Sequence, residues 1–198
     1  MTVLVTGNLG YVGSVLTPML SQRGHQVRGL DSGFFKDCLL SSEVEPPDQV
    51  IKDIRDIERE DLDGIKAIVH LAGLSNDPLG ELDASLTEAI NYDGSMRLGE
   101  LARDAGVRRL IYASSQSMYG RAATGVELEE DDSDKNPLTA YARTKWEAEQ
   151  GLMSLRSRGF EVTAFRPSTV YGASPRLRCD IVFNNFVACA YTTGAIEV

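Results

Sequence analysis

A glycine-rich turn near the N-terminus constrains the fold more than any other feature of this sequence. The apolar run Val3–Val5 predicts a strand, and a segment with helical periodicity begins within thirteen residues. Between them, Gly7 permits a tight turn, Gly10 lets a phosphate approach the backbone, and Gly13 lets helix and strand pack closely. The helix dipole adds partial positive charge there. The turn therefore predicts an anion site for a dinucleotide pyrophosphate, although such glycines also end strands in ordinary α/β proteins. The residues expected around the site are Gly7, Leu9, Gly10, Tyr11, Val12 and Gly13.

An acidic residue after the second apolar segment indicates which dinucleotide binds. Asp31 follows Gln26–Leu30 and lies eighteen residues beyond Gly13. A carboxylate at this place accepts hydrogen bonds from both hydroxyls of the adenosine ribose, and it repels a 2′-phosphate. We therefore expect the cofactor to be NAD rather than NADP.

Strand-like and helical segments alternate along the chain. The predicted strands are Val3–Val5, Val27–Leu30, Val50–Lys52, Ala67–Leu71, Leu110–Ala113 and Val162–Phe165. The predicted helices are Tyr11–Arg23, Ile57–Leu62, Ala84–Ala105, Ala140–Arg158 and Ile181–Tyr191. This alternation is typical of an α/β fold, a Rossmann-type doubly wound parallel sheet with helices on both faces. We expect residues 1–172 to form an NAD-binding domain. Residues 173–198 are too few for a second domain, which usually needs about 50 residues.

Composition excludes several classes of function. The net charge of −9 over 198 residues argues against nucleic acid as a partner. No apolar stretch approaches the roughly 20 residues of a membrane span, and no signal segment precedes the first strand. The three cysteines and two histidines lack metal-ligand spacing, so we expect no metal site. Buried or incidental thiols in a reducing, cytoplasmic setting are the interpretation that follows.

A tyrosine and a lysine lie four residues apart in a predicted helix. Tyr141 and Lys145 therefore share one helix face. A phenol with a pKa of about 10 is a poor base at neutral pH, but a nearby ammonium and a cationic nicotinamide both favour the phenolate. Ser115 ends a strand 26 residues upstream of Tyr141, at the edge where ligands bind in open α/β sheets. The alternative for the Tyr/Lys pair alone is a packing tyrosine with a surface lysine.

Taken in order, these motifs resemble the extended short-chain dehydrogenase/reductase family, of the NAD-dependent nucleotide-sugar epimerase/dehydratase type. The matching segments are residues 6–13, Asp31, residues 53–56, 70–73, 91–94, 114–120, the Tyr141/Lys145 pair and residues 166–172. They extend along nearly the whole chain, and the glycine spacing is similar to that of the extended branch.

The resemblance implies a role for each matching residue. Ser115, Tyr141 and Lys145 would be catalytic: the serine holds the substrate oxygen, the tyrosine is the acid/base, and the lysine binds the nicotinamide ribose. Further residues implied to contact NAD are Asp53 and Ile54 beside the adenine, Leu71, Ala72 and Gly73 on the path to the nicotinamide, Asn91 and Pro167. Residues implied to bind a nucleotide-sugar are Ser75, Ser117, Thr169, Arg176, Arg178 and Asn185. His70 is expected to be a core strand residue rather than a ligand.

One departure from the family pattern bears on the reaction. Members that dehydrate hexoses carry Thr-Asp-Glu where this chain has Ser115-Gln116-Ser117. Glutamine and serine supply neither the acid nor the base that elimination of water needs. We therefore expect an epimerase that oxidises and re-reduces C4 of the sugar. The alternatives are an NAD-dependent carbonyl reductase or alcohol dehydrogenase of the same family, and a non-catalytic NAD-binding module.

The second departure is length. Relatives continue for about a hundred further residues, which form the domain that grips the nucleotide. We therefore expect a truncated form that holds only the beginning of this substrate-binding region. In it, Arg176, Arg178 and Asn185 would be exposed and mobile. The helices around 84–105 and 140–158 are the faces on which relatives dimerise, so a homodimer is expected.

Overall fold

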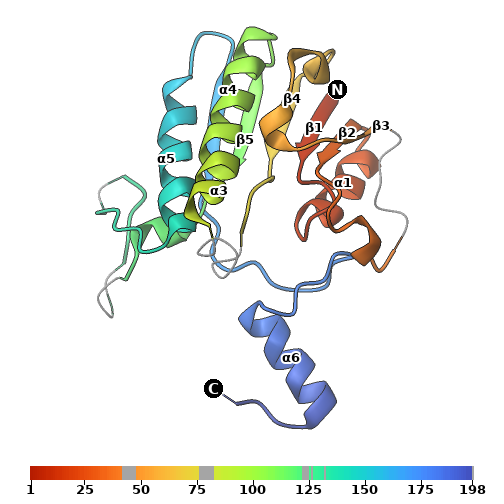
Figure 1. Cartoon of the computed structure of the whole chain (residues 1–198), viewed down its shortest axis with the longest axis vertical. Helices are drawn as coiled ribbons and strands as arrows, with labels where there is room; N and C mark the ends of the chain where they lie inside the picture. The colour runs from red at the N-terminus through yellow and green to blue at the C-terminus, as the bar shows by residue number, and fades with distance from the viewer. Residues whose placement is uncertain (42–47, 76–82, 122–124, 126, 132, 198) are drawn as a thin grey trace.

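A six-stranded parallel sheet organises the chain (Figure 1). The computed structural model describes residues 1–41, 48–75, 83–121, 125, 127–131 and 133–197. The strands are β1 (Thr2–Thr6), β2 (Gln26–Asp31), β3 (Asp48–Ile51), β4 (Ala67–His70), β5 (Arg109–Ala113) and β6 (Glu161–Phe165). Their order is β3-β2-β1-β4-β5-β6, so the direction of winding reverses between β1 and β4. Ligands of open α/β sheets bind at such a reversal. The predicted Rossmann-type sheet is confirmed.

The register of the strands brings the predicted motifs to one edge. Thr6, the last residue of β1, pairs with Leu30 of β2 and with His70 of β4. The glycine turn, Asp31 and the segment after His70 therefore all leave the sheet at the same level. This alignment places the candidate site at the carboxyl ends of the strands.

The helices differ from the predicted ones mainly at their boundaries. The α-helices are α1 (Gly13–Gln22), α3 (Ala84–Glu88), α4 (Gly94–Asp104), α5 (Ala140–Ser154) and α6 (Val182–Thr193). A π-helical turn, η4 (Ala89–Asp93), interrupts the helix expected over 84–105. Short 3-10 turns are η1 (Lys36–Cys38), η2 (Ile54–Asp56), η3 (Arg59–Leu62) and η5 (Gln116–Tyr119). The helix expected at 57–62 is therefore only the short turn η3.

Hydrophobic side chains cover both faces of the sheet. Leu4 of β1 packs into the larger core cluster with Leu98 of α4 and Leu152 of α5. Its neighbours Val3 and Val5 belong to a second cluster, against which Leu20 of α1 packs. In Figure 1 α4 and α5 lie on one face and α1 on the other. Burial on both faces explains why the strands are continuous apolar runs rather than alternating patterns.

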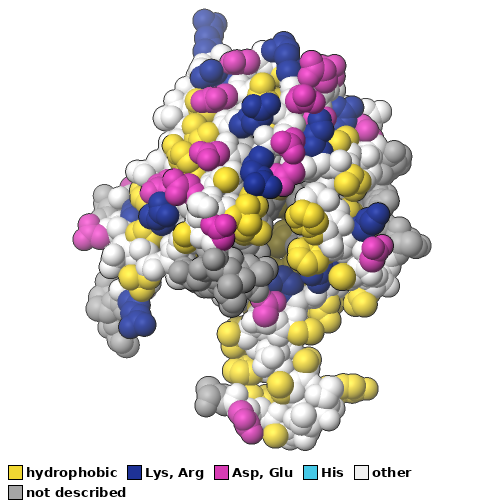
Figure 2. Space-filling model, in the orientation of Figure 1, with side chains coloured by type: hydrophobic (Ala, Val, Ile, Leu, Met, Phe, Trp, Pro, Cys, Tyr) yellow, Lys and Arg dark blue, Asp and Glu magenta, His cyan; other side chains and the backbone are white. Residues whose placement is uncertain are grey.

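The C-terminal segment leaves the sheet and ends in α6, which projects from the body of the molecule (Figure 1). None of the residues of α6, all of which the structure describes, is buried. Figure 2 shows hydrophobic side chains along this helix, and Tyr191 is 91% exposed. In the described part of the chain, no helix is long and apolar enough to cross a membrane. Of the two expectations for the cysteines, buried or incidental thiols, burial does not apply to Cys38 and Cys179, which are exposed.

Candidate functional site

The glycine turn has the geometry that its spacing predicts. Gly7 has a φ of 70°, and a Cβ atom on it would lie 2.7 Å from the backbone nitrogen of Ala72. A Cβ atom on Gly13 would collide with the carbonyl oxygen of Gly7 and lie 2.6 Å from Cα of Asn8. The amide of Gly10 donates to the carbonyl of Gly7 at 3.1 Å and closes the turn. Both Gly7 and Gly13 therefore allow a backbone approach that no other residue permits.

Helix α1 begins directly after this turn. No side chain of the described residues caps it, and its first turn contains no acidic residue. The amides of Ser14 and Leu16 donate to the carbonyls of Gly10 and Val12, and the helix dipole favours an anion at this N-terminal end of the helix. Leu9 is buried, whereas Tyr11 is partly exposed and Val12 is 41% exposed. These features fit a pyrophosphate.

Asp31 lies against the glycine turn, as its position at the end of β2 predicts. Its Oδ2 accepts a hydrogen bond from the amide of Leu9 at 3.1 Å, and its Oδ1 accepts from the amide of Gly33 at 2.8 Å. Burial raises the pKa of the Asp31 carboxyl, and the two backbone hydrogen bonds partly offset this effect. The carboxylate is thus held rigidly beside the turn, where a ribose would lie.

Asp53 and Ile54 follow β3. The Asp53 carboxylate accepts from the amide, Nε and Nη2 of Arg55 at 2.9, 3.0 and 2.9 Å. The side-chain hydrogen bond from Arg55 lowers the pKa of Asp53. The Ile54 side chain is only 4% exposed and packs in the core, so a ligand would meet its backbone. Their contact with adenine stays a prediction.

The loop after β4 is held by Asn91 of η4. The Asn91 side chain accepts from the amide of Leu74 at 2.8 Å and donates to the carbonyl of the same residue at 3.0 Å. A Cβ atom on Gly73 would lie 2.9 Å from Oδ1 of Asn91 and 4.0 Å from Nζ of Lys145. Leu71, Ala72 and Gly73 therefore run between Asn91 and the glycine turn, with the lysine close by. The structure thus brings together these residues, as the resemblance implies.

Ser115 lies just beyond β5 and caps the 3-10 turn η5. Its Oγ accepts a hydrogen bond from the Ser117 amide at 3.1 Å and another from the Ser117 hydroxyl at 2.8 Å. No acceptor among the described residues takes the proton of the Ser115 hydroxyl, and the residue is 9% exposed. Two hydrogen bonds into the oxygen polarise the hydroxyl, so Ser115 can donate to a ligand oxygen.

Tyr141 and Lys145 occupy the first two turns of α5, which packs against η5. Thr139 caps this helix by accepting from the Ala142 amide at 3.1 Å. Tyr141 is half-buried, and Lys145 is 6% exposed with Nζ 4.5 Å from the centroid of the Tyr112 ring. Burial lowers the pKa of Lys145 to about 8. The interpretation of Lys145 as a surface lysine is therefore wrong.

The segment after β6 crosses the glycine turn. The hydroxyl of Tyr11 donates to the carbonyl of Gly172 at 2.7 Å and accepts from the Asn184 side chain at 3.1 Å. Ser174 is buried and donates to the carbonyl of Tyr11 at 2.7 Å. Sequence reasoning assigned no role to Asn184 or Ser174, because only contacts with residues 160 to 173 positions away distinguish them from their neighbours.

Two arginines of this segment have different surroundings. Arg178 donates to the Ser75 hydroxyl at 3.0 Å and pairs with Asp180 at 2.6 Å. Asp180 raises the pKa of Arg178, and the phenols of Tyr141 and Tyr11 contribute to this effect. Arg178 thus contacts Ser75 and Asp180, and it lies within electrostatic range of the phenols of Tyr141 and Tyr11.

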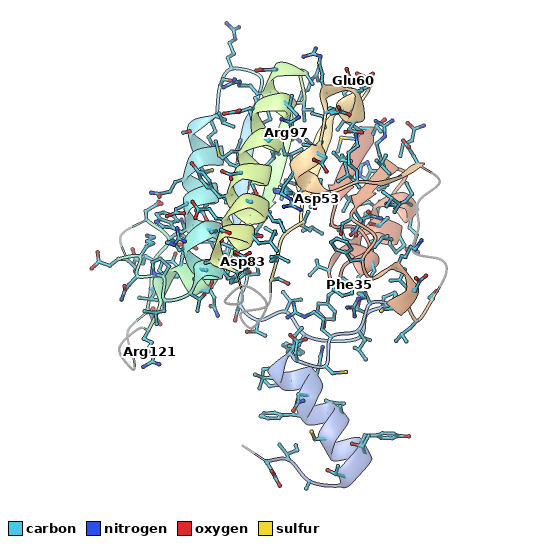
Figure 3. All side chains as sticks on the ribbon, viewed as in Figure 1. Phe35, Asp53, Glu60, Asp83, Arg97 and Arg121 are labelled. Atoms are coloured by element: carbon cyan, nitrogen blue, oxygen red, sulfur yellow. The ribbon has the colours of Figure 1, made fainter. Side chains whose placement is uncertain are left out.

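Arg176 contacts a different residue. It stacks on Phe35, whose side chain is labelled in Figure 3, with its guanidinium 4.4 Å from the ring centroid. Both arginines are only partly exposed, so the expectation that they would be exposed is wrong: Phe35, Ser75 and Asp180 supply packing partners. Asn185 is exposed as expected, and it accepts a hydrogen bond from Cys189 of its own helix at 3.6 Å.

The remaining predicted residues lie at the end of β6. The carbonyl of Pro167 accepts a hydrogen bond from the amide of Gln116 at 3.2 Å, which ties this segment to η5. Thr169 is exposed. Their contacts with cofactor or substrate stay predictions.

An ion pair between the partly buried Arg166 and the buried Glu149 fixes the far end of η5. Arg166 pairs with Glu149 of α5 at 2.6 Å and donates to the Tyr119 hydroxyl at 2.6 Å. Glu149 is 3% exposed. Arg166 directly follows β6 and contacts both Glu149 of α5 and Tyr119 of η5. It therefore links the turn that follows Ser115 to the sheet and to α5. The sequence contained no signal for this pair, because its members are seventeen residues apart.

Comparison with known proteins agrees with this geometry. The profile described as "NAD dependent epimerase/dehydratase family" matches residues 3–197. UDP-glucose 4-epimerase of Mycolicibacterium smegmatis is 34% identical over 182 residues, which cover 87% of this chain and 57% of that protein. The solved structure of MoeE5 in complex with UDP-glucuronic acid and NAD has 28% identity and a TM-score of 0.81, and the match covers 96% of this chain and 61% of that chain.

A further solved structure is that of TunA, described as an NAD dependent NDP-hexosamine 5,6-dehydratase. It has 25% identity and a TM-score of 0.85, with 98% of this chain and 62% of that chain covered. The chain thus spans about three fifths of the length of these proteins. A glycine turn, an aligned acidic residue and a matching profile over nearly the whole sequence lead to one conclusion. This chain belongs to the NAD-dependent epimerase/dehydratase family.

Proposed function

We propose that this chain forms the cofactor-binding and catalytic part of an NAD-dependent nucleotide-sugar epimerase, with Ser115, Tyr141 and Lys145 as catalytic residues. The observation that carries the proposal is the hydrogen bonding of Ser115. Its oxygen accepts twice from Ser117, so its own proton is available to a sugar oxygen. Tyr141 and Lys145 lie on the helix that packs against the same turn.

The residues at the sheet edge fit NAD. When bound, NAD supplies a group that accepts a hydride and returns it to the same carbon. The uncapped N-terminus of α1 would hold the pyrophosphate, and Asp31 would bind the adenosine ribose. Asn91 holds the backbone at Leu74, which keeps the loop on the nicotinamide side in place.

Each catalytic side chain has a distinct task. Tyr141 takes the proton from the C4 hydroxyl of the sugar and later gives it back. Lys145 has a pKa of about 8 and is therefore positively charged at neutral pH, which favours the phenolate form of Tyr141. Ser115 holds the oxygen that alternates between hydroxyl and carbonyl.

The residues after Ser115 favour epimerisation over dehydration. Gln116 donates through its side chain to the Ser168 hydroxyl at 3.1 Å, and Ser117 donates to Ser115. Neither residue can act as an acid or base at neutral pH. A site with this composition retains the proton transfer of Tyr141 and lacks the additional acid/base pair that loss of water needs.

We further propose that residues 173–198 begin the substrate-binding region. Arg178 contacts Ser75 and lies within electrostatic range of Tyr141, and its guanidinium can pair with a diphosphate. A nucleoside diphosphate sugar would then meet the cation while its hexose faces Ser115. The other residues that we propose to contact the substrate are Ser117, Thr169, Arg176 and Asn185.

The test is isomer interconversion by the protein as expressed from its own gene. UDP-hexoses are incubated with NAD⁺, and both isomers are followed by chromatography together with NADH absorbance. The Tyr141→Phe variant should lose at least about a hundredfold in turnover, because it removes general acid–base catalysis. Tyr92→Phe is the matched control, since Tyr92 of η4 is also partly buried and has no proposed contact with cofactor or substrate.

The outcomes separate the alternatives. Interconversion without net NADH supports the epimerase. Net NADH production from a sugar or alcohol would instead identify a dehydrogenase. Unchanged turnover in Tyr141→Phe would remove Tyr141 from the mechanism. NAD⁺ binding without turnover of any substrate would favour the non-catalytic module.

A further inference from the structure

A buried histidine, His70, connects the residue before the glycine turn to helix α4. His70 ends β4 and is fully buried. Its Nδ1 lies 2.7 Å from the hydroxyl of Thr6, the residue immediately before Gly7. Its Nε2 lies 2.8 Å from the hydroxyl of Ser95 in α4. The mechanism proposed above assigns no task to this imidazole.

The hydrogen bonds around His70 determine its tautomer. The Ser95 hydroxyl donates to the carbonyl of Asn91 at 2.5 Å, so its proton is already engaged. Its oxygen must therefore accept the Nε2–H of His70, because two acceptors 2.8 Å apart would repel each other. Nδ1 is then unprotonated and accepts from the Thr6 hydroxyl. The Thr6 oxygen in turn accepts from the Ala72 amide at 3.3 Å.

The result is a continuous chain of donors and acceptors from Ala72 through Thr6, His70 and Ser95 to Asn91. At one end it holds the amide of Ala72. At the other it holds the backbone of Asn91, whose side chain binds both the amide and the carbonyl of Leu74. The loop 72–74 is therefore fixed at both ends by one hydrogen-bonded network.

The charge on His70 is constrained as well. Burial, reinforced by the nearby ammonium of Lys145, lowers the pKa of His70 to about 3. Burial of the imidazole therefore favours its neutral form, and the hydrogen bonds to Thr6 and Ser95 determine which nitrogen carries the proton.

We propose that His70 is a positioning residue for the nicotinamide half of the cofactor: as a neutral Nε2–H imidazole, it fixes the loop 72–74 and Asn91 through Thr6 and Ser95. The proposal rests on NAD binding at this edge and not on the epimerase reaction. It predicts that His70 affects ligands that carry nicotinamide and leaves the adenosine half unaffected.

The first test examines the tautomer in the unmodified site. The chain has two histidines, so the His25→Gln variant leaves His70 as its only imidazole. A long-range ¹H–¹⁵N spectrum should show one protonated nitrogen, Nε2, and one unprotonated nitrogen, Nδ1, unchanged from pH 5 to pH 9. A protonated ring, or protonation at Nδ1, would overturn the proposal without reference to any activity.

The second test measures binding by titration calorimetry with NAD⁺ and with ADP-ribose, which lacks the nicotinamide. Ser95→Ala and His70→Asn both interrupt the arm that leads to Asn91. Each should weaken NAD⁺ binding by about tenfold, the usual worth of one buried hydrogen bond, and leave ADP-ribose within about twofold. His70→Gln keeps an N–H that reaches Ser95 and should restore most of the NAD⁺ affinity.

The comparison of the two ligands separates positioning from general damage. Parallel weakening of NAD⁺ and ADP-ribose would show a purely structural role and overturn the proposal, as would an equal loss in His70→Gln and His70→Asn. If the protein bound NAD⁺ normally but lacked epimerase turnover, the proposed function would fail while the role of His70 stood.

Discussion

Replacing Lys145 by methionine should make the protein more stable. The ammonium of Lys145 is 6% exposed, and burial lowers its pKa from 10.5 to about 8. Burial of the charged form therefore disfavours folding at neutral pH. Methionine has a similar length and no charge, and its thioether can contact the Tyr112 ring that now lies 4.5 Å from Nζ.

The magnitude follows from the two pKa values. The pKa difference of about 2.5, at 1.36 kcal/mol for each unit, corresponds to about 3 kcal/mol. Below pH 8 both the folded and the unfolded chain carry the proton, so the full cost is present. Between pH 8 and 10.5 the unfolded chain binds more protons, so the stability of the wild type rises with pH. Above 10.5 neither form carries the charge and the cost disappears.

The assay is urea denaturation between pH 6.5 and 10, followed by the fluorescence of the single tryptophan, Trp146. Lys145→Met should exceed the wild type by about 3 kcal/mol in free energy of unfolding at pH 7, and the difference should shrink as the pH approaches 10.5. Burial also raises the pKa of Tyr112, but that residue is common to both proteins and its effect cancels.

The control is Lys66→Met, because Lys66 is exposed. A surface substitution of this kind should change stability by no more than about 0.5 kcal/mol at any pH. Equal or lower stability of Lys145→Met at pH 7 would refute the reasoning, and so would a difference that does not vary with pH. Confirmation would mean that the fold tolerates an unfavourable buried cation, as expected for a residue retained for function.

Three further predictions concern the cofactor, the Arg166–Glu149 ion pair and assembly. Calorimetry should show NAD⁺ binding about tenfold tighter than NADP⁺, and Asp31→Ala should narrow that ratio; equal affinities in the wild type would contradict the role of Asp31. Arg166→Met should lower the free energy of unfolding by about 3 kcal/mol, because it leaves Glu149 buried without its partner. The matched exposed variant Arg109→Met should cost less than about 1 kcal/mol, and similar losses in both would argue against a special role for the Arg166–Glu149 pair. Light scattering at micromolar concentration should give a homodimer formed through helices 84–105 and 140–158, and a monomer alone would contradict this expectation.

Local sequence was sufficient for the main features of the fold. The apolar runs, the glycine turn and the helical periodicity are each visible among neighbouring residues. The six strands and the helices that connect them in a parallel sheet could therefore be predicted. The turn requires glycine at positions 7 and 13 on steric grounds, so these residues could be recognised from the sequence. Asp31 could likewise be placed beside the glycine turn, because the residue that ends the second strand lies next to the turn that follows the first.

Element boundaries depended on contacts between distant segments. The helix expected over 84–105 contains the π-helical turn η4, in which the side chain of Asn91 bonds to Leu74 and the hydroxyl of Ser95 bonds to its carbonyl. The helix expected to reach Arg158 ends at Ser154; beyond it, the backbone of Ser157 pairs with Phe160 in an isolated bridge, and the Arg156 side chain donates to the carbonyl of Val162. Periodicity carries no information about such bonds.

The features of the candidate site also fall into those that local sequence predicts and those that only the tertiary structure reveals. The sequence alone determined Ser115, Tyr141 and Lys145 as candidates, because each lies in a recognisable local motif. Only the tertiary structure decided that Lys145 is buried, that His70 joins the glycine turn to α4, and that Arg178 contacts Ser75 whereas Arg176 stacks on Phe35. These facts depend on which side chains the folded sheet brings within hydrogen-bond distance. Partners separated by 25 to more than 100 positions leave no pattern in the neighbouring sequence.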